Sequence, residues 1–598
     1  MELAYIEAYN RLSRAVSESL GKERVDEIDS YIDIESRYAD IATNAPIRLS
    51  KAYNLDYKIV SSSIIENLRS YGLEAEFKNG FVNVVINADK IVESLYKILK
   101  DPKSLLLDIF NNKRIVVEFP SANPVHPLHL GHLRNFILGD FIYRLYKYLG
   151  ADPVRLDYID DLGLQAAQAL YGYINLKLDD KAKFDHALGK LYVEVNRSEE
   201  LKKASEELLV KIERADPSIK PKLDEMVNRC VEAHYQTEEL YGVYHDLKVK
   251  ESDIVEADLL DKALDLLKSR GIADLEKEGR YANCLVVDLA EISEEFKGMK
   301  ENKKVLVRSN GTATYVAKDI AFHMWKLGLF KDPFRYKIVK RQPDNTDLYE
   351  VSGNGIERDF ISDTAINIID YRQSYPQMVL KAIIERFDST KRIRHIAYGI
   401  VNLEETKLSG RKGTWIGNTA DDLFYIMKEK IDQSFKINDD HKLNRLANAA
   451  IRFEFLRFTN DKDISFSWSR ALDINNASGP YALYTYARAN KLVVDSGIDT
   501  SKIEISKELL DSNELRIAKL IVKSQLYLIK AERSLDPSIL VNHISKLLVE
   551  FNSFYERYPI LKEDNEQKRL NRLALTKSFA ETLRILLNIL GIEVLDII

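Results

Sequence analysis

Two histidines, His129 and His132, stand three residues apart at the expected start of a long helix. The first turn of a helix has free backbone N–H groups, which together with the helix dipole favour a bound anion such as phosphate. Taken alone, the tetrapeptide His129-Leu130-Gly131-His132 is more often a surface cap or part of a core. Its surroundings decide the matter, and they predict a phosphate site.

The segments around this tetrapeptide predict a strand, a helix and a second strand. Residues 114 to 119 and 154 to 159 are short apolar runs rich in β-branched side chains. Between them apolar side chains recur at helical spacing, and Gly150 followed by Pro153 ends the helix. Such a unit implies a parallel sheet, and ligands of parallel sheets bind outside the carboxyl ends of the strands. We therefore expect the histidines at that edge of the sheet.

Composition and length limit the class of protein. A chain of 598 residues is too long for one hydrophobic core, so we expect three or four domains. With 45% hydrophobic and 30% charged residues and no apolar run of 18, it has the composition of a soluble protein without a membrane partner. Only Cys230 and Cys284 occur, far apart, which argues against a protein-bound zinc ion and for a reducing, cytoplasmic compartment.

The predicted fold class is multidomain, α/β plus all-α. Residues 1 to 105 form a small α+β N-terminal domain. Residues 106 to 440 form a Rossmann-like domain built on a parallel sheet, with an insertion of charged helices at about 165 to 288. Residues 441 to 598 form a C-terminal helical bundle.

Several elements inside these parts are predicted individually. Residues 80 to 87, GFVNVVIN, alternate like an edge or half-buried strand. Beyond the inserted helices, strands resume at Leu285 and Lys304. A helix follows from about Asp319, and a further strand covers residues 366 to 370.

The tetrapeptide with its surroundings resembles the HIGH motif of class I aminoacyl-tRNA synthetases, and further segments resemble one family of them, the arginyl-tRNA synthetases. Residues 121 to 124, SANP, stand where this family usually has S-P-N-P, and Glu118 precedes them at the family's spacing. Residues 311 to 321, GTATYVAKDIA, and the segment IDYRQSYPQ around Gln373 follow in the family's order. The resemblance spans nearly the whole chain and is closest to archaeal members.

The resemblance implies that the chain activates L-arginine with ATP and transfers it to tRNA(Arg). The residues that match the family's arginine-binding positions are Glu118, Ser121, Asn123, His129, Tyr315, Asp319 and Gln373. Because carboxylates match a planar guanidinium bidentately, Glu118 and Asp319 would select arginine. His129 and His132 would donate to the phosphate oxygens of ATP, Gly131 would leave room for the adenine, and Mg²⁺ would bridge the phosphates.

A further implied element is the loop that binds the leaving pyrophosphate. Residues 407 to 413, KLSGRKG, stand where the family has K-M-S-K-S, and Gly410 replaces the second lysine. The residues implied to bind phosphate or to supply the missing charge are Lys407, Ser409, Arg411 and Lys412. Some members carry that charge just before the histidine motif, where this chain has His126, so which cation acts stays open.

The predicted helical bundle carries side chains suited to RNA. Tyr481, Tyr484 and Arg488 fall on about two turns of one helix, and exposed aromatic rings and arginine stack on unpaired bases. A tyrosine stripe, which here includes Tyr486, is by itself more often part of a core. The segment resembles the family's G-P-Y-x-x-Y-x-x-x-R, which implies contact with the anticodon loop, and Tyr555 lies in a second matching segment. The net charge of −6 is no obstacle, since residues 441 to 598 carry 23 Lys and Arg against 20 Asp and Glu.

Two other interpretations stay open. A class I lysyl-tRNA synthetase would share the fold, although a lysine site needs only a point charge whereas Tyr315, Asp319 and Glu118 suit a planar fork. A non-catalytic tRNA-binding paralogue would also share it. The intact His129, His132, Lys407 and Asp319 argue against that alternative, while Gly410 in place of the second lysine keeps it open. The expected partners are tRNA(Arg), L-arginine and ATP, for a cytoplasmic monomer that binds tRNA before it activates arginine.

Overall fold

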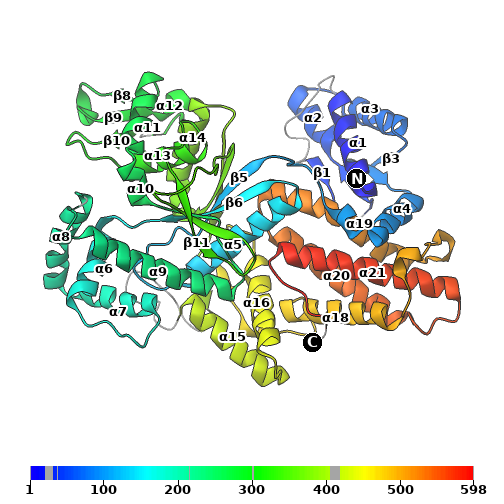
Figure 1. Cartoon of the computed structure of the whole chain (residues 1–598). Coiled ribbons are helices and arrows are strands. Elements are labelled where there is room, and N and C mark those ends of the chain that lie inside the picture. Colours follow the sequence, from blue (N-terminus) through cyan, green and yellow to red (C-terminus); the bar gives the residue numbers. More distant parts are fainter. Residues whose placement is uncertain are drawn as a thin grey trace. The chain divides into compact units, whose positions relative to one another are not determined.

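The computed structural model of the chain describes residues 2–19, 31–36, 38–214, 216–299, 302–403 and 418–596. The chain divides into two compact units, each described here by itself. The central unit comprises Asp108–Asp473 and Ile589–Ile592. The terminal unit comprises Met1–Leu107, Ile474–Asn588 and Glu593–Ile598. Both units are drawn in Figure 1, coloured along the sequence.

A seven-stranded sheet organises the central unit. Its strands are β5 (Arg114–Glu118), β6 (Asp152–Ile159), β7 (Leu247–Lys250), β11 (Tyr336–Arg341), β12 (Asp347–Val351), β13 (Thr364–Asp370) and β14 (Arg392–Tyr398). They lie in the order β11-β12-β7-β6-β5-β13-β14, and every neighbouring pair is parallel except β11 with β12. The carboxyl ends of β5, β6 and β13 therefore meet at one edge, which is where the candidate site lies.

The predicted strand, helix and strand around the histidine motif are confirmed. Helix α5 (Leu130–Tyr148) joins β5 to β6 and is buried along most of its length, as expected for a crossover helix with apolar side chains on most of its faces. Gly150 follows the helix with φ +88°, a conformation that other residues rarely adopt. The chain thus turns at once into β6.

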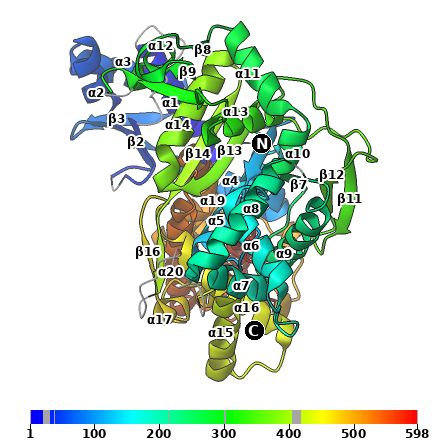
Figure 2. The ribbon, with the colours of Figure 1, turned by 90° about the vertical axis from the view of Figure 1, so that its left-hand side faces the viewer.

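Four helices follow β6 and form the predicted insertion. They are α6 (Gly163–Asn175), α7 (Phe184–Arg197), α8 (Glu199–Glu213) and α9 (Lys220–Leu240), seen together in Figure 2. Apolar side chains of these helices form a hydrophobic cluster that also includes Val125, Ile159 of β6 and Leu348 of β12. The sequence pattern predicts helices up to about residue 288. In the structure β7, only four residues long, lies inside this stretch and belongs to the central sheet.

A small antiparallel sheet precedes the second half of the central sheet. Its strands are β8 (Asp274–Leu275), β9 (Leu285–Asp288) and β10 (Lys303–Val307). The helices before, between and after these strands are α10 (Glu251–Glu256), α11 (Leu259–Ser269), α12 (Leu289–Ile292) and α13 (Tyr315–Lys326), and α14 (Ser374–Phe387) follows β13. The strands predicted at Leu285 and Lys304 exist, but they pair with each other antiparallel in the order β10-β9-β8, outside the central sheet. Helix α13 begins at Tyr315, earlier than the predicted start at about Asp319.

The remaining part of the central unit follows β14. Its elements are β15 (Val401–Leu403), α15 (Ala420–Phe435), α16 (Asp440–Leu456), β16 (Ile464–Phe466) and α17 (Trp468–Ala471), with β15 and β16 paired in parallel. The segment 404–417 lies outside the described residues. It contains four of the predicted site residues, Lys407, Ser409, Arg411 and Lys412.

The N-terminal part of the terminal unit is an α+β layer. It consists of α1 (Ala4–Ser19), β1 (Ile32–Asp33), β2 (Ile41–Thr43), α2 (Ala45–Tyr53), α3 (Tyr57–Ser70), β3 (Glu74–Lys78), β4 (Phe81–Val85) and α4 (Ala88–Lys100). The sheet is antiparallel in the order β1-β2-β4-β3. The strand predicted from GFVNVVIN is therefore internal to the sheet, and its middle residues are buried.

The C-terminal part of the terminal unit is a helical bundle of α18 (Gly479–Asp495), α19 (Ser512–Ser534), α20 (Ser538–Arg557) and α21 (Glu566–Ile589). It is joined to the N-terminal layer through Asp40, whose carboxylate accepts hydrogen bonds from Tyr5 and Lys519 at 2.8 Å each. The predicted fold class is confirmed, and the three domain boundaries stay a prediction. Among the described helices, none combines the length and apolar character that a membrane span requires.

Candidate active site

His129 and His132 close the start of α5 by capping it and each other. His129 is the N-cap residue, and its Nδ1 accepts the backbone N–H of Gly131 at 3.0 Å and of His132 at 3.4 Å. In return, Nδ1 of His132 accepts the backbone N–H of His129 at 3.3 Å. The two rings stack with centroids 3.8 Å apart and planes 14° from parallel. Both side chains are thereby fixed in orientation before any ligand arrives.

The capping bonds also decide the protonation of the two rings. A ring nitrogen that accepts an N–H carries no proton, so each neutral imidazole bears its proton on Nε2. Burial, together with the neighbouring charge of His126, lowers the pKa of His129 to about 3. Burial and the charge of His129 lower the pKa of His132 well below its ordinary value. At neutral pH the pair therefore offers two uncharged Nε2–H donors.

Two further residues belong to this end of the site. Gly131 has no room for a side chain, because a Cβ there would lie 2.8 Å from Cε1 of His129. The capping ring of His129 is therefore the main reason why this position requires glycine. Arg372, just past β13, is close enough that its charge contributes to the lowered pKa of His129, and it forms an ion pair with Asp370 at 2.7 Å. The sequence reasoning missed Arg372, although it stands next to the predicted Gln373.

Glu118, the last residue of β5, is buried and paired within the protein. Its Oε2 accepts a hydrogen bond from the ammonium of Lys326, at the end of α13, and Oε1 accepts one from the Ser121 hydroxyl at 3.3 Å. Burial alone would raise the pKa of Glu118, but the charge of Lys326, the neighbouring His323 and the hydrogen bonds from Lys326 and Ser121 together outweigh burial and hold the pKa below its ordinary value. Glu118 is therefore ionised, and each of its two oxygens already accepts a hydrogen bond from the protein.

Asp319 lies on α13 and differs from Glu118 in having no such partner. Its carboxylate makes no side-chain hydrogen bond or ion pair with the residues that the structure describes. Burial raises its pKa to about 7, and the neighbouring charges of Glu118 and Glu251 contribute to the rise. Tyr315, one turn earlier, is 80% exposed, so the helix presents this predicted pocket residue to solvent.

A buried network of hydrogen bonds joins the elements around Glu118 and Asp319. Lys326 also donates to Oδ1 of Asn367 on β13 at 3.1 Å. The amide of Asn367 donates to Nε2 of His323 at 2.8 Å and to Oε1 of Gln377 at 2.8 Å. His323 in turn donates through Nδ1 to the carbonyl of Asp319 at 2.7 Å. The network ties α13, α14 and β13 together, so Glu118 and Asp319 are held by residues far apart in the sequence.

The other predicted arginine-binding residues lie at the same edge of the sheet. Ser121 adopts φ +53°, and its backbone N–H donates to the buried carboxylate of Asp157 at 3.3 Å. Asn123 donates to Oε1 of Gln165 at 2.9 Å. Gln373 ends a single exposed turn, Tyr371–Gln373, after β13. Asp157 and Gln165 were not predicted, and only their positions within β6 and at the start of α6 suggest them.

Sequence reasoning also missed an acidic pair beside Asp319. Asp160, past the end of β6, shares a hydrogen bond with Glu251, and burial followed by that bond raises its pKa to about 8. Lys318 donates to Oε1 of Glu251 at 2.7 Å. The site thus contains four carboxylates, with Lys318 and Lys326 as their described cationic partners. Such an arrangement has excess capacity for a positively charged ligand.

In the terminal unit, the four predicted RNA-binding residues come together. The Arg488 guanidinium on α18 lies over the ring of Tyr484, 4.6 Å from its centroid, and over the ring of Tyr555 on α20, 4.8 Å from its centroid. Tyr484 is 48% exposed, whereas Tyr486 is buried and belongs to the core. Two helices therefore build one aromatic and cationic surface.

Asn552 on α20 connects this surface and was not predicted. Its side-chain oxygen accepts a hydrogen bond from Arg488 at 3.1 Å, and its amide donates to the Tyr481 hydroxyl at 2.7 Å. The same amide donates to Thr485 at 3.3 Å. Asn552 lies one turn before Tyr555 on α20, and its place in the sequence gives no sign of its contacts with α18. Only the three-dimensional structure identifies it.

Comparison with known proteins gives matches in both units. Residues 94–342 match the family described as tRNA synthetases class I (R), catalytic domain. Residues 482–598 match the family described as DALR anticodon binding domain. The first match includes the histidine motif and Asp319, and the second includes Tyr484, Arg488 and Tyr555.

Whole-chain relatives agree with these matches. The arginine–tRNA ligase of Thermococcus kodakarensis is 31% identical over 99% of both chains. That of Thermus thermophilus is 33% identical over 80% of this chain and 81% of its own. The solved arginyl-tRNA synthetase of Thermus thermophilus superposes with a TM-score of 0.84 at 28% identity and covers 98% of this chain and 100% of that one. The Plasmodium falciparum structure, with a TM-score of 0.76 and 19% identity over 100% of both chains, shares the fold.

Proposed function

The chain belongs to the arginine–tRNA ligase family, and from this premise we propose that it joins L-arginine to tRNA(Arg) at the carboxyl edge of its central sheet. A class I synthetase of this family uses ATP, and the reaction has two steps. In the first, a carboxylate oxygen of arginine attacks the α-phosphorus of ATP, and the bond to the β-phosphate breaks to release pyrophosphate. In the second, a terminal hydroxyl of the tRNA attacks the arginyl carbonyl and AMP leaves.

The observation that carries the assignment of the amino-acid site is the carboxylate of Asp319. It is the pocket carboxylate without a side-chain partner among the described residues, and burial together with the negative charges of Glu118 and Glu251 raises its pKa. A positive charge beside it is therefore what the pocket would gain from a ligand. A guanidinium would supply that charge and match the carboxylate with two parallel N–H donors. Glu118 would add a charge beside it, and Tyr315 would turn onto the ligand from its exposed position. Ser121, Asn123, His129 and Gln373 would hold the amino and carboxylate ends of arginine.

The geometry favours arginine over lysine at this site. Lys326 already supplies an ammonium to Glu118, and Lys318 supplies one to Glu251, so point charges are provided internally. The site lacks hydrogen-bond donors to the Asp319 carboxylate among the described side chains. A planar guanidinium offers two parallel donors to such a carboxylate, whereas an ammonium fits it less well. A ligand that left this carboxylate unpaired would be disfavoured by about 10⁴-fold, which removes the need for editing.

Adenylation needs no covalent chemistry from the protein, so positioning and electrostatics carry it. The two Nε2–H donors of His129 and His132 would bind phosphate oxygens where charge develops, and Gly131 would let the adenine approach the helix start. Because both rings are neutral, the charge of the phosphates must be met by cations. Arg372 is a described candidate, and Lys407, Arg411 and Lys412 in residues 407 to 413 are further candidates. The Ser409 hydroxyl in the same segment would add an uncharged donor.

Mg²⁺ would enter with ATP as a bridge between phosphate oxygens. The described residues offer a single group of three side chains close enough to share a metal, Asp185, His186 and Asp421, and Lys183 already neutralises it. At the catalytic edge, Glu118 and Glu251 are paired with lysines, Asp160 shares a hydrogen bond with Glu251, and Asp319 is proposed to bind arginine. A resident metal is thus not part of the proposal, and Mg²⁺ is treated as a partner of the substrate.

The tRNA would be bound by the aromatic and cationic surface of the terminal unit. Tyr484, Tyr555 and Arg488 present ring faces and a guanidinium on which anticodon bases can stack, and Tyr481 is fixed beside them by Asn552. The family match over residues 482–598 supports an anticodon-binding role for this surface. We also propose that the protein acts as a monomer in the cytoplasm and activates arginine only after tRNA is bound.

Charging of total tRNA with radiolabelled arginine, with lysine in parallel, tests the function. Arginine attachment that depends on ATP is the expected result, and lysine attachment would transfer the chain to the rival synthetase. Tight tRNA binding without either attachment would indicate the non-catalytic paralogue. ATP–pyrophosphate exchange in the absence of tRNA should be near background, and robust exchange would contradict the proposed order of binding.

A further inference from the structure

The segment that leads into the histidine motif is supported by the start of α15. The backbone N–H of Ala420 donates to the carbonyl of Leu128 at 2.8 Å, and Thr419 forms an antiparallel bridge with His129. The hydroxyl of Tyr241, at the end of α9, donates to the carbonyl of Ala420 at 2.7 Å. The orientation of the capping histidine therefore depends on where the first turn of α15 is held.

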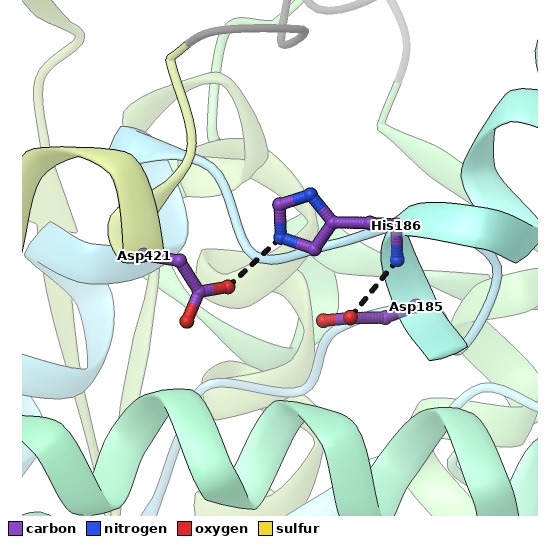
Figure 3. Close-up of side chains that lie close together, drawn as sticks. All are labelled: Asp185, His186 and Asp421. Atoms are coloured by element: carbon purple, nitrogen blue, oxygen red, sulfur yellow. Dashed lines mark hydrogen bonds and ion pairs between the residues drawn. The ribbon is translucent and has the colours of Figure 1, made fainter. Parts of the chain in front are cut away.

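That first turn is held by the inserted helices through Asp421. Its carboxylate oxygens accept hydrogen bonds from the Lys183 ammonium at 3.0 and 3.3 Å and from the Thr237 hydroxyl at 3.1 Å each. Nε2 of His186, on α7, lies 3.0 Å from Oδ2 of Asp421, as Figure 3 shows. Asp185, also shown there, accepts its neighbour's backbone N–H at 2.9 Å. Asp421 thus meets side chains from just before α7, from α7 itself and from α9.

Asp185, His186 and Asp421 are side chains of the kinds that bind metal cations, but the ammonium of Lys183 beside them argues against a cation site. The ammonium of Lys183 lies 3.3 Å from Asp185 and 3.0 Å from Asp421, between the two carboxylates. Burial alone would lower the pKa of His186, but the hydrogen bond to Asp421 and the negative charges of Asp185 and Asp421 together outweigh burial and raise that pKa. The carboxylates are therefore neutralised by groups of the protein, and the cluster acts as a buried clamp.

We infer that Asp421 is a positioning residue for His129, and that the helical insertion sets the geometry of the phosphate site through it. The inference rests on the proposed function, since arginine activation is what it would change. The chain of contacts runs from α7 and α9 to the Asp421 carboxylate, and from the backbone of Thr419 and Ala420 to that of Leu128 and His129. Loosening the clamp should move the histidine donors and leave the arginine pocket around Asp319 in place.

The test compares Asp421→Ala and Asp421→Asn with the wild type in full-chain aminoacylation. Rates are expressed per active site, counted by active-site titration, and thermal unfolding is recorded for each variant. We expect kcat per site to fall by about 10- to 100-fold in Asp421→Ala. The KM for arginine should rise by no more than about fivefold, because only the contact of His129 with the arginine main-chain end would shift, while the guanidinium site at Asp319 stays in place. Asp421→Asn should lose less, because its amide oxygen still accepts from Thr237 and Lys183.

A matched control lies in the same insertion. Asp179 pairs with Lys190 at 3.5 Å on the surface, with both side chains about half exposed, so Asp179→Ala removes an acidic partner without touching the clamp. It should leave kcat, KM and the unfolding temperature close to those of the wild type. A kcat loss in this control as large as in Asp421→Ala would assign the effect to the insertion's general charge and overturn the inference.

Two milder variants keep the inference testable if Asp421→Ala does not fold. His186→Asn and Thr237→Val each weaken or remove one interaction with Asp421 and should lower kcat per site by a smaller factor. Combined with Asp421→Asn, each should show non-additive losses, since all act through one contact. An unchanged kcat per site in folded clamp variants would overturn the positioning role. A wild type that fails to charge arginine would instead defeat the proposed function.

Discussion

Nδ1 of His129 and Nδ1 of His132 each accept the other residue's backbone N–H, at 3.4 and 3.3 Å. This reciprocal cap resembles the serine–glutamate capping box of other helices but is built from two imidazoles. The cap uses only the Nδ1 atoms, so within the described part of the chain both Nε2–H groups stay available as donors. One pair of residues thus closes the helix and prepares two donors for an anion.

The cap and the donor functions of His129 can be separated by mutation. Asparagine also caps helices well but ends short of the Nε2 position, so His129→Asn should retain the cap. We expect its free energy of unfolding to fall by less than about 1 kcal/mol. Its kcat for aminoacylation should fall by about 10²- to 10³-fold, as when one donor to a developing charge is lost. Urea unfolding and steady-state kinetics measure the two effects, and a kcat close to the wild type would contradict the donor role.

The protonation of the histidine pair gives a second prediction. Because burial holds the pKa of His129 at about 3 and that of His132 well below normal, neither ring should gain a proton between pH 5 and pH 8. Nitrogen-15 NMR of histidine-labelled protein should show both rings as neutral Nε2–H tautomers over this range. A titration of either ring near its ordinary pKa of about 6.5 would contradict the described cap.

Asp319 predicts a pH dependence of arginine binding. Its pKa is raised to about 7, so the carboxyl is largely neutral below that pH and ionised above it. A guanidinium pairs with the ionised form, so the KM for arginine should fall as the pH rises, by about tenfold from pH 6 to pH 8. Asp319→Asn cannot ionise and should show a raised KM that is nearly independent of pH. A wild-type KM that rises over this range would reverse the expected sign.

Much of this site follows from the sequence, because local patterns determine the elements that carry it. The apolar periodicity of α5 and the β-branched runs of β5 and β6 place His129 at a helix start on the edge of a parallel sheet. Tyr481, Tyr484 and Arg488 share one helix, so their spacing alone brings them together. Elements built by residues close in the chain are thus predicted well.

The contacts between distant segments were not predictable in this way. Lys326 pairs with Glu118 across 208 positions, and Asp421 meets Lys183 across 238. Strand β7 is four residues long and lies among helices, so its membership of the sheet depends on pairing with β6 and β12. Short strands and side-chain partners of this kind are decided by tertiary packing.

The surface around Arg488 yields a prediction about tRNA. Stacking on an aromatic or guanidinium face contributes about 1–3 kcal/mol per base, so Arg488→Ala should weaken tRNA binding by about 5- to 150-fold. Arg488→Lys keeps the charge but loses the planar stack and should recover part of the loss. Arg516, which pairs with Glu550 on the surface of the same unit, provides the control variant Arg516→Ala. Filter binding measures the affinities, and equal losses in both alanine variants would point to general electrostatics.

The most direct test of the account compares the wild type with Asp319→Ala in aminoacylation of tRNA. The wild type should charge arginine, and the KM of the variant for arginine should rise by at least about 100-fold, because a charge-assisted bidentate pair is lost. The KM for ATP should change by less than about threefold, since the histidine cap is untouched. An unchanged KM for arginine in a folded variant would contradict the claim that this carboxylate selects the guanidinium.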